Sequence, residues 1–383
     1  MSEILLQDSG MWNVDVLSHP PRTYDAPGFS ADGVQALFFE SVPWKGKPTR
    51  VFAWMGVPKA ASGSRVPGMV LVHGGGGTAF ANWVQLWNAR GYAAIAMDTC
   101  GCLPSGVFDR RPRHELGGPP GWGGFDQMDW PLRDQWSYHA VAAVILAHSL
   151  LRSLPEVDSE RIGVTGNSWG GYLTSVAASV DGRFALAAPL YGCGFLAESS
   201  CFAPALNGLP PDRRRQWIEN WDAASHLGKL RAPIVWINGT NDFAFPLDSW
   251  QKSYQLTPNR TPVCTLRMEH ADGDTVNPLE TFLAAESILK KSAPGLAVVT
   301  AQGVESQRIW ATYGSEVPIA RAELLFTRQR TPWVERLWES IPAELDVAAR
   351  RASAVIPAGT SACFLNLVDA RGGTVSSEHV EFG

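Results

Sequence analysis

The sequence predicts an α/β fold built on a mostly parallel, doubly wound sheet, followed by a smaller all-β unit. Short runs of continuously apolar residues recur over the first three quarters of the chain, as expected for strands buried on both faces. Stretches with the apolar spacing of helices lie between these runs. After residue 295 the helical spacing stops, and short strand-like runs separated by turn residues replace it.

The individual elements follow from local patterns along the chain. Residues 34–58 give two β runs around a Lys-Gly-Lys-Pro turn. Helices are expected at 134–154 and 278–291, where length and apolar spacing suit them. Core strands are expected at 68–73, 92–98, 161–166, 183–190, 232–239 and 262–269.

These elements divide the chain into three expected parts. N-terminal strands at 1–66 lead into an α/β catalytic domain at 67–295, and a β-sandwich-like domain at 296–383 follows. Two segments, at about 99–130 and about 191–229, interrupt the α/β pattern. Each follows the carboxyl end of an expected strand, where open α/β sheets place their ligand sites. We therefore expect both segments to shape a pocket.

Composition and charge favour some partners over others. The 383 residues are 45 % apolar and 18 % charged, which predicts a large core, and the formal charge is −5. The basic runs at 109–114 and 213–215 are short and are read as solvated faces, so neither nucleic acid nor a membrane is expected as a partner. A small-molecule substrate is expected, and the oligomeric state is left open.

The N-terminal sequence carries no sign of export. The first 15 residues lack a basic start, an apolar core and a small-residue cleavage site. No apolar run approaches the roughly 18 residues of a membrane span. The expected location is therefore the cytoplasm, although a signal already removed would leave no trace.

The six cysteines show no metal-binding pattern. Cys100 and Cys102 stand too much alone for a zinc site. Cys193 and Cys201 fall in one expected loop and would be able to pair in an oxidising compartment, but small buried or free thiols are the expectation. No metal site is predicted.

One serine stands in an unusual setting. The run Gly-Asn-Ser-Trp-Gly at 166–170 follows an expected strand and precedes an expected helix from Gly171. This context matches the G-x-S-x-G nucleophile elbow, where glycines allow a turn too tight for side chains. The turn exposes the hydroxyl of Ser168 at a helix N-terminus, whose partial positive charge favours a developing anion. Ser168 is the candidate nucleophile, and a purely structural turn is the alternative.

A serine nucleophile needs a base, which histidine supplies. Three histidines follow the serine in the sequence. His226 falls in an interrupting segment and His379 in the terminal β unit. His270 directly follows the last expected core strand and is the candidate base.

The histidine in turn needs an acid to orient it. Asp242 follows the fifth expected core strand, and the 28 residues from there to His270 leave room for one helix and one strand. Asp248 is the alternative, although it is placed to begin or cap the next helix. Asp272 and Asp274 adjoin the histidine, where local loop geometry rarely aims a carboxylate at Nδ1.

A glycine-rich loop follows the first core strand. His73 is followed by four glycines, Gly74–Gly77, whose backbone N–H groups can approach a substrate carbonyl closely. Candidate oxyanion donors are Gly75, Gly76 and Trp169, the residue after the nucleophile. No Lys-Ser/Thr pair follows, so the loop is not a phosphate-binding P-loop. His73 is expected to orient the loop and not to transfer protons.

Together, the glycine loop, the serine elbow, the aspartate segment and the histidine resemble the α/β-hydrolase superfamily. They are most similar to its dienelactone hydrolase, acetyl xylan esterase and prolyl-oligopeptidase-like branch, over about 50–290. The resemblance implies an α/β-hydrolase fold and a triad of Ser168, Asp242 and His270. Two departures matter. Prolyl-oligopeptidase relatives carry a large N-terminal propeller or cap, whereas about 60 residues precede the expected core here, which counts against a dedicated oligopeptidase. The terminal β unit is no part of the minimal hydrolase.

The expected function is cofactor-independent hydrolysis of carboxylic esters through an acyl-enzyme. A small acyl group on a carbohydrate or related alcohol is the favoured substrate. A serine peptidase with the same triad and a non-catalytic scaffold are the alternatives. The basic loop at 110–114 leaves an acidic substrate open. Aromatic rings suit sugar stacking, and of the 16 tryptophans the expected pocket residues are Trp122, Trp130 and Trp136, with ordinary packing as the alternative.

Overall fold

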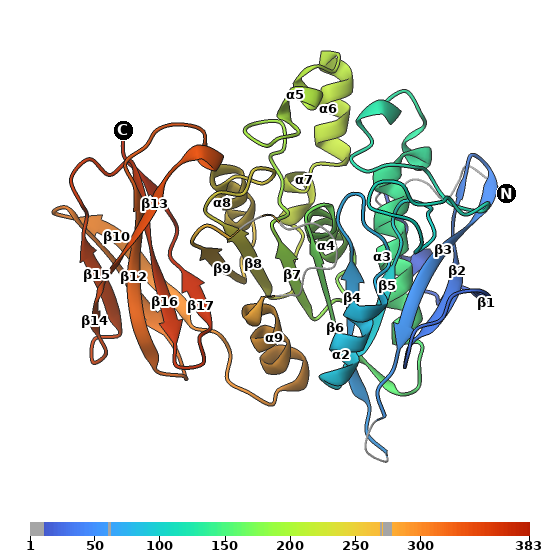
Figure 1. Cartoon of the computed structure of the whole chain (residues 1–383), viewed down its shortest axis with the longest axis horizontal. Coiled ribbons are helices and arrows are strands. Elements are labelled where there is room, and N and C mark those ends of the chain that lie inside the picture. Colours follow the sequence, from blue (N-terminus) through green and yellow to red (C-terminus); the bar gives the residue numbers. More distant parts are fainter. Residues whose placement is uncertain (1–10, 60–62, 269, 271–277) are drawn as a thin grey trace.

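The computed structural model describes residues 11–59, 63–268, 270 and 278–383. Its central sheet has the strand order β1-β2-β3-β5-β4-β6-β7-β8-β9 (Figure 1). Neighbours from β1 to β5 pair antiparallel, and those from β5 through β4 to β9 pair parallel, which confirms the mostly parallel sheet. The strands are β1 (Thr23–Asp25), β2 (Gln35–Trp44), β3 (Lys47–Gly56), β4 (Val66–Val72), β5 (Ala93–Met97), β6 (Val157–Asn167), β7 (Leu186–Leu190), β8 (Ile234–Gly239) and β9 (Arg260–Thr265).

Helices cover both faces of this sheet. Neighbouring residues of a strand point to opposite faces. A side chain at Gly68 of β4 would meet Leu151 of α3, whereas a side chain at Gly163 of β6 would meet Leu289 of η4. Gly163 pairs with Met69, the neighbour of Gly68, so α3 and η4 lie on opposite faces. The helices near the sheet are α1 (Val14–Leu17), α2 (Ala81–Ala89), α3 (Trp136–Arg152), α4 (Trp169–Val180), α8 (Leu247–Gln255), α9 (Leu279–Ala285) and the π-helical turn η4 (Glu286–Lys290).

The core explains why the sequence runs are continuously apolar. Every residue of β4, β5, β7 and β8 is buried, because helices cover both of their faces. Several boundaries differ from expectation. Strand β7 begins at Leu186 and β9 ends at Thr265, so both are shorter than predicted. Strand β6 begins at Val157, several residues earlier than predicted, and α4 begins at Trp169 and not at Gly171, because the serine itself stands at the N-cap.

The two interrupting segments meet at one end of the sheet (Figure 1). The indole N–H of Trp217 donates to the Gly123 carbonyl at 2.8 Å, and that of Trp221 donates to Gln135 at 2.7 Å. These bonds tie the segment after β7 to the segment after β5. The short helices involved are η2 (Phe125–Gln127), η3 (Leu132–Asp134), α5 (Ala203–Asn207), α6 (Pro211–Asn220) and α7 (Ala224–Leu227).

Antiparallel sheets form the C-terminal part of the chain. One has the order β10-β11-β15-β14, and the other contains β13-β12-β16-β17 with β18 beside β16. Alternate residues of β11 are buried in a second hydrophobic core that the two sheets share. The elements are β10 (Val298–Glu305), β11 (Arg308–Gly314), β12 (Ile319–Thr327), η5 (Trp333–Glu335), β13 (Trp338–Pro342), β14 (Glu344–Asp346), β15 (Arg351–Val355), β16 (Ala362–Asp369), β17 (Thr374–Ser376) and β18 (Val380–Glu381).

This C-terminal part packs against β9, the edge strand of the central sheet (Figure 1). The Cys264 N–H donates to the Ser376 hydroxyl at 2.8 Å. The Asn366 amide donates to the Cys264 carbonyl at 2.9 Å. Polar side chains of β16 and β17 thus satisfy backbone groups of an edge strand that would otherwise face solvent.

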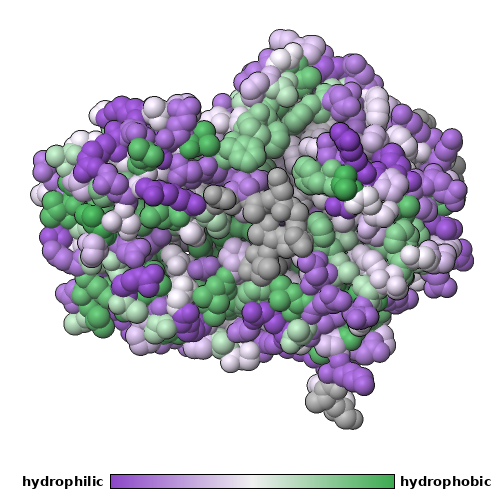
Figure 2. Space-filling model, in the orientation of Figure 1, coloured by the Kyte–Doolittle hydropathy of each residue, from purple (hydrophilic) through white to green (hydrophobic). Residues whose placement is uncertain are grey.

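On the face shown in Figure 2, hydrophobic side chains are interspersed with hydrophilic ones. No helix among the described residues has the length and apolar character needed to cross a membrane.

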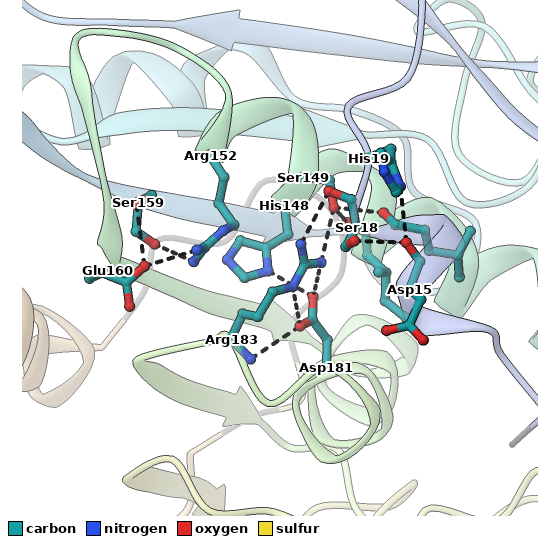
Figure 3. A network of polar contacts seen from close by, with 12 residues as sticks. Asp15, Ser18, His19, His148, Ser149, Arg152, Ser159, Glu160, Asp181 and Arg183 are labelled. Atoms are coloured by element: carbon teal, nitrogen blue, oxygen red, sulfur yellow. Dashed lines mark hydrogen bonds and ion pairs between the residues drawn. The ribbon is translucent and has the colours of Figure 1, made fainter. Parts of the chain in front are cut away.

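A buried polar network joins α1, α3 and the turn after α4 (Figure 3). His148 Nδ1 lies 2.9 Å from Asp181 Oδ2, and neither side chain is exposed. The guanidinium of Arg183 donates twice to the same carboxylate, at 2.7 Å each. Its other terminal nitrogen donates to the Ser18 carbonyl at the end of α1. The Ser149 hydroxyl donates to the carbonyl of Leu17, so the network fastens α1 to the core.

Candidate active site

The serine elbow is built by close contact between β4, β6 and α4. Ser168 has φ 56° and ψ −123°, a strained conformation for a residue with a side chain. A Cβ at Gly166 would lie 2.4 Å from the carbonyl oxygen of Val72, and one at Gly170 would lie 2.0 Å from the same atom. Both positions therefore require glycine. The tight turn places Ser168 directly before the first turn of α4.

Three side chains from distant parts of the sequence meet at this elbow. Ser168 Oγ lies 2.9 Å from His270 Nε2, and His270 Nδ1 lies 2.7 Å from Asp242 Oδ2. Because the carboxylate is an acceptor only, Nδ1 carries the proton and Nε2 accepts from the serine hydroxyl. The histidine side chain is 4 % exposed and that of the aspartate 1 %, so water is largely excluded from both bonds.

The aspartate is held by backbone groups. Asp242 Oδ1 accepts from the N–H groups of Ala244, at 2.9 Å, and Phe245, at 2.7 Å. These bonds occupy one oxygen and leave Oδ2 directed at His270. The turn that follows β8 thus fixes the carboxylate before any substrate binds.

The other candidate acids are not in this position. The carboxylate of Asp248 accepts from the Ser199 hydroxyl at 2.7 and 2.8 Å. It also accepts from the backbone N–H of Ser249 in the first turn of α8. Asp272 and Asp274 lie outside the described residues.

The other two histidines serve local structure. His226 bonds through Nε2 to the Asn220 carbonyl at 2.9 Å. His379 packs edge-on against Trp333 with 5.2 Å between ring centroids. Of the three candidates, the structure brings His270 to the serine.

Three aromatic rings around His270 were not anticipated from the sequence. Tyr191, Phe243 and Phe245 lie with ring centroids 4.3, 5.0 and 6.2 Å from the imidazole. Tyr191 directly follows β7, and the two phenylalanines follow Asp242 after β8. The rule that ligand sites lie at the carboxyl ends of parallel strands would have selected all three positions.

The glycine loop lies directly against the elbow. A Cβ at Gly74 would be 3.1 Å from the Cβ of Ser168, and one at Gly75 would be 2.8 Å from Cδ1 of Trp169. The Trp169 N–H begins α4 and has no partner one turn earlier in the helix. Gly76 is placed differently, because a Cβ there would meet the ring of Phe108 at 2.6 Å. Gly75 and Trp169 are thus nearer the serine than Gly76.

His73 holds this loop in place. The Thr99 N–H donates to its Nε2 at 3.0 Å, so Nδ1 carries the proton and donates to the Gly74 carbonyl at 2.7 Å. Burial lowers the pKa of His73 and keeps the ring neutral. Both ring nitrogens are occupied, which suits an orienting role.

The predicted pocket tryptophans occupy three different environments. Trp122 lies against the glycine loop, with Nε1 3.2 Å from the position a Cβ of Gly75 would take. Trp136 is fully buried, and its edge packs against Trp169 at 5.5 Å. It supports the residue after the nucleophile from behind and does not line a pocket, because α3 carries it into the core.

Trp130 also departs from the expectation. It packs against Trp44 at 6.2 Å between ring centroids, and the Lys45 ammonium lies 4.0 Å from its ring. These partners belong to the β2–β3 hairpin, so Trp130 anchors the segment after β5 to that hairpin.

The cysteines are free thiols, including buried Cys193 and exposed Cys201. Among the residues that the structure describes, no group of three or more His, Cys, Asp or Glu side chains is arranged to hold a metal ion.

Comparison with solved structures supports the same fold. An acetyl xylan esterase from Paenibacillus sp. R4 superposes with a TM-score of 0.54 at 21 % identity, covering 70 % of this chain and 89 % of that one. Acetyl xylan esterase 1 from Thermoanaerobacterium sp. JW/SL YS485 gives a TM-score of 0.54 at 15 % identity, covering 73 % and 94 %. The chain thus has the fold of an α/β-hydrolase.

A model of one protein family matches just under half of the chain. The acetyl xylan esterase (AXE1) family matches residues 30–199, which include β2 to β7 and the serine elbow. No curated protein matches the sequence significantly. The family match and the fold together support a carboxylic ester hydrolase.

Proposed function

We propose that this α/β-hydrolase is a serine esterase that removes small acyl groups, acetyl above all, from carbohydrate esters. The observation that carries the proposal is the hydrogen-bonded chain from Ser168 through His270 to Asp242, with distances of 2.9 and 2.7 Å. The family match and the names of the two similar structures, both acetyl xylan esterases, support the choice of an acetylated carbohydrate.

The proposed mechanism begins with proton transfer. His270 Nε2 takes the proton of the Ser168 hydroxyl as Oγ attacks the ester carbonyl. Asp242 holds the ring with Nδ1 protonated and stabilises the imidazolium that forms. The imidazolium then gives its proton to the leaving alkoxide, and the acyl group stays on the serine. Water, activated by the same histidine, releases the acid and restores the enzyme.

The oxyanion of each tetrahedral intermediate would rest on backbone N–H groups. Trp169 directly follows the serine, Gly75 lies against its indole, and these two residues are the best placed donors. Removal of one such donor typically costs about 2.7–4 kcal/mol of transition-state stabilisation. The neutral ring of His73 keeps the loop in position by holding the Gly74 carbonyl.

A cluster of aromatic rings beside the triad supports a small acyl group. Phe202 lies 4.7 Å from Trp169 and 5.7 Å from Phe245 between ring centroids, and Phe125 packs against both Trp169 and Phe202. Phe245 in turn stacks beside His270. These rings form an apolar wall beside Trp169 and His270, which suits a small apolar acyl group.

The direct test is hydrolysis of acetylated xylo-oligosaccharides, followed by release of acetate, with the wild type and Ser168→Ala. A fluorophosphonate probe with intact-mass detection adds a second measurement. We expect acetate release and a single adduct in the wild type, and neither in the variant.

Two other outcomes would redirect the assignment. Turnover of aminoacyl anilides comparable with that of 4-nitrophenyl acetate would favour a serine peptidase. A folded wild-type protein that forms no adduct and releases no acetate would favour a non-catalytic scaffold.

A further inference from the structure

An open hollow lies beside the glycine loop, with Gly76 and Gly77 in its wall. Its volume is about 290 Å³. It adjoins the elbow through Trp122, because a Cβ at Gly75 would lie 3.2 Å from Trp122 Nε1 and 2.8 Å from Cδ1 of Trp169. Its lining residues are Gly76, Gly77, Cys100, Cys102, Asp109, Arg111, Arg113, Pro120, Gly121 and Trp122.

Arg111 is anchored in this hollow by one end of its guanidinium. Nε donates to the Gly76 carbonyl at 3.4 Å, and the Asp109 N–H donates to the same oxygen at 3.3 Å. Within the part of the chain that the structure describes, the two terminal nitrogens of Arg111 have no hydrogen bond or ion pair. The guanidinium is half-buried, so an unpaired charge there favours an anionic ligand.

The second arginine of the hollow, Arg113, already has hydrogen-bond partners for both terminal nitrogens. Arg113 donates through Nη1 to the Cys100 carbonyl at 2.7 Å and through Nη2 to the Gly118 carbonyl. Its terminal nitrogens therefore shape the wall of the hollow. Asp109 is exposed at the rim. Arg111 is thus the cation in the hollow that has nitrogens left for a ligand.

The remaining polar groups do not offset this charge. Burial raises the pKa of the Cys102 thiol to about 11, and burial also raises the pKa of Cys100, so both stay neutral near pH 7. The charged residues that line the hollow are therefore two arginines and one aspartate, which leaves a net positive charge. The flat ring of Trp122 forms an adjoining wall, which suits a sugar ring.

We propose that the hollow binds the alcohol part of the substrate through a carboxylate that pairs with Arg111, so that the preferred substrates are acyl esters of uronic acids. A guanidinium fork matches a carboxylate with two parallel hydrogen bonds, which a neutral hydroxyl cannot reproduce. Trp122 brings the hollow next to Trp169, so a sugar ring in the hollow would carry its small acyl group toward Ser168. This inference rests on the proposed esterase function.

The test compares two matched esters, an acetylated methyl glucuronoside and the corresponding acetylated methyl glucoside. We expect the wild type to prefer the anionic ester in kcat/KM, and Arg111→Gln to reduce that preference about tenfold, mainly through KM. Arg111→Gln should lower kcat/KM for the neutral ester less than for the anionic ester, and urea unfolding like that of the wild type would show that the variant folds. Arg111→Lys should keep part of the preference.

Arg110→Gln is the matched control, because Arg110 stands on the same loop but does not line the hollow. It should leave the preference unchanged. The proposal is overturned if the wild type shows no preference, if Arg111→Gln keeps it, or if Arg110→Gln loses it equally.

Failure of the esterase assignment is distinguishable from failure of this inference. If neither ester is hydrolysed, binding of methyl glucuronoside and methyl glucoside to the wild type and to Arg111→Gln is measured by calorimetry. Tighter binding of the glucuronoside that depends on Arg111 supports the carboxylate site even without turnover. Equal binding of the two sugars by the wild type rejects it.

Discussion

The chain contains two buried His–Asp pairs, and they differ in what surrounds them. In both, a histidine Nδ1 meets an aspartate Oδ2, at 2.7 Å for His270–Asp242 and at 2.9 Å for His148–Asp181. A serine lies near each pair. The first pair stands at the carboxyl ends of the parallel strands, and the second lies where α3 meets the turn after α4 (Figure 3).

The partners of each aspartate explain the difference. Asp242 is held by two neutral N–H groups, so the carboxylate can still stabilise a charge that develops on its histidine. Asp181 is already paired with the Arg183 guanidinium. A second positive charge on His148 would add little attraction to the carboxylate and would be repelled by the arginine.

The free nitrogens of the two rings differ as well. His270 Nε2 faces the Ser168 hydroxyl, whereas His148 Nε2 has no hydrogen-bond partner among the described residues. The ring of His148 stacks on Phe184 at 3.8 Å and is fully buried. Ser, His and Asp in proximity therefore do not define a reactive centre. The nitrogen that is not bound to the aspartate must face the hydroxyl, and substrate must reach it.

The largest expected effect is the loss of catalysis when Ser168, the serine beside the first pair, is replaced. Ser168→Ala should lower kcat for acetyl esters by about a million-fold, because the nucleophile is removed. Turnover of 4-nitrophenyl acetate by the purified variant measures it. Retention of a tenth of the wild-type rate would remove this serine from the mechanism.

The same substitution in both aspartates sharpens the contrast. Asp242→Asn should lower kcat about 10⁴-fold with little change in stability, because the amide favours the wrong tautomer of His270. Asp181→Asn should instead lower the free energy of unfolding by about 3 kcal/mol, since it leaves Arg183 without its carboxylate. Urea unfolding and kcat are measured for both variants. Equal catalytic loss in the two would contradict the assignment of roles.

Acid should affect the structural pair in a specific pH window. Burial lowers the pKa of His148 despite its bond to Asp181, so the folded protein keeps this ring neutral. Below the unfolded pKa of about 6.5, the unfolded chain takes up a proton that the folded chain does not. Stability therefore falls as pH drops from there toward the folded pKa, by up to about 1.4 kcal/mol per pH unit.

His148→Asn tests this dependence. The asparagine amide can still donate to Asp181 but does not titrate. Urea unfolding between pH 5 and 7.5 should give a shallower decrease for the variant than for the wild type. The same slope in both proteins would assign the decrease to other groups.

The smallest expected effect concerns the serine of the second pair. Ser149→Ala removes the hydrogen bonds to the Leu17 carbonyl and from Arg183, and should lower the free energy of unfolding by about 1–2 kcal/mol. Esterase activity should remain unchanged. A catalytic defect without a loss of stability would show that the two regions are coupled.

Much of this architecture could be predicted because the signals are local. Buried parallel strands are continuously apolar, and the glycines around Ser168 mark a turn that no other residue fits. The order of serine, aspartate and histidine along the sheet then selects one candidate for each position. His148 and Asp181 are the same residue types, but His148 precedes the serine in the sequence and Asp181 follows a helix and not a strand.

Other features depend on contacts between segments far apart in the sequence. The aromatic richness of the two interrupting segments suggested a pocket, yet Trp130 packs on Trp44, and Trp136 at the start of α3 is buried against α4. Burial of a tryptophan is decided by which element covers it, and composition does not carry that information. Likewise, nothing local distinguishes Arg111 from Arg113, because the difference is which carbonyls each can reach.

The contact between β9 and the C-terminal sheets has a consequence for protein engineering. Ser376 and Asn366 occupy backbone groups of Cys264 that belong to the central sheet. A chain cut between α9 and β10 would uncover this strand edge and offer it to a second molecule. Trimming the enzyme to its hydrolase portion would therefore trade a smaller protein for one prone to aggregate, even though all three triad residues would be retained.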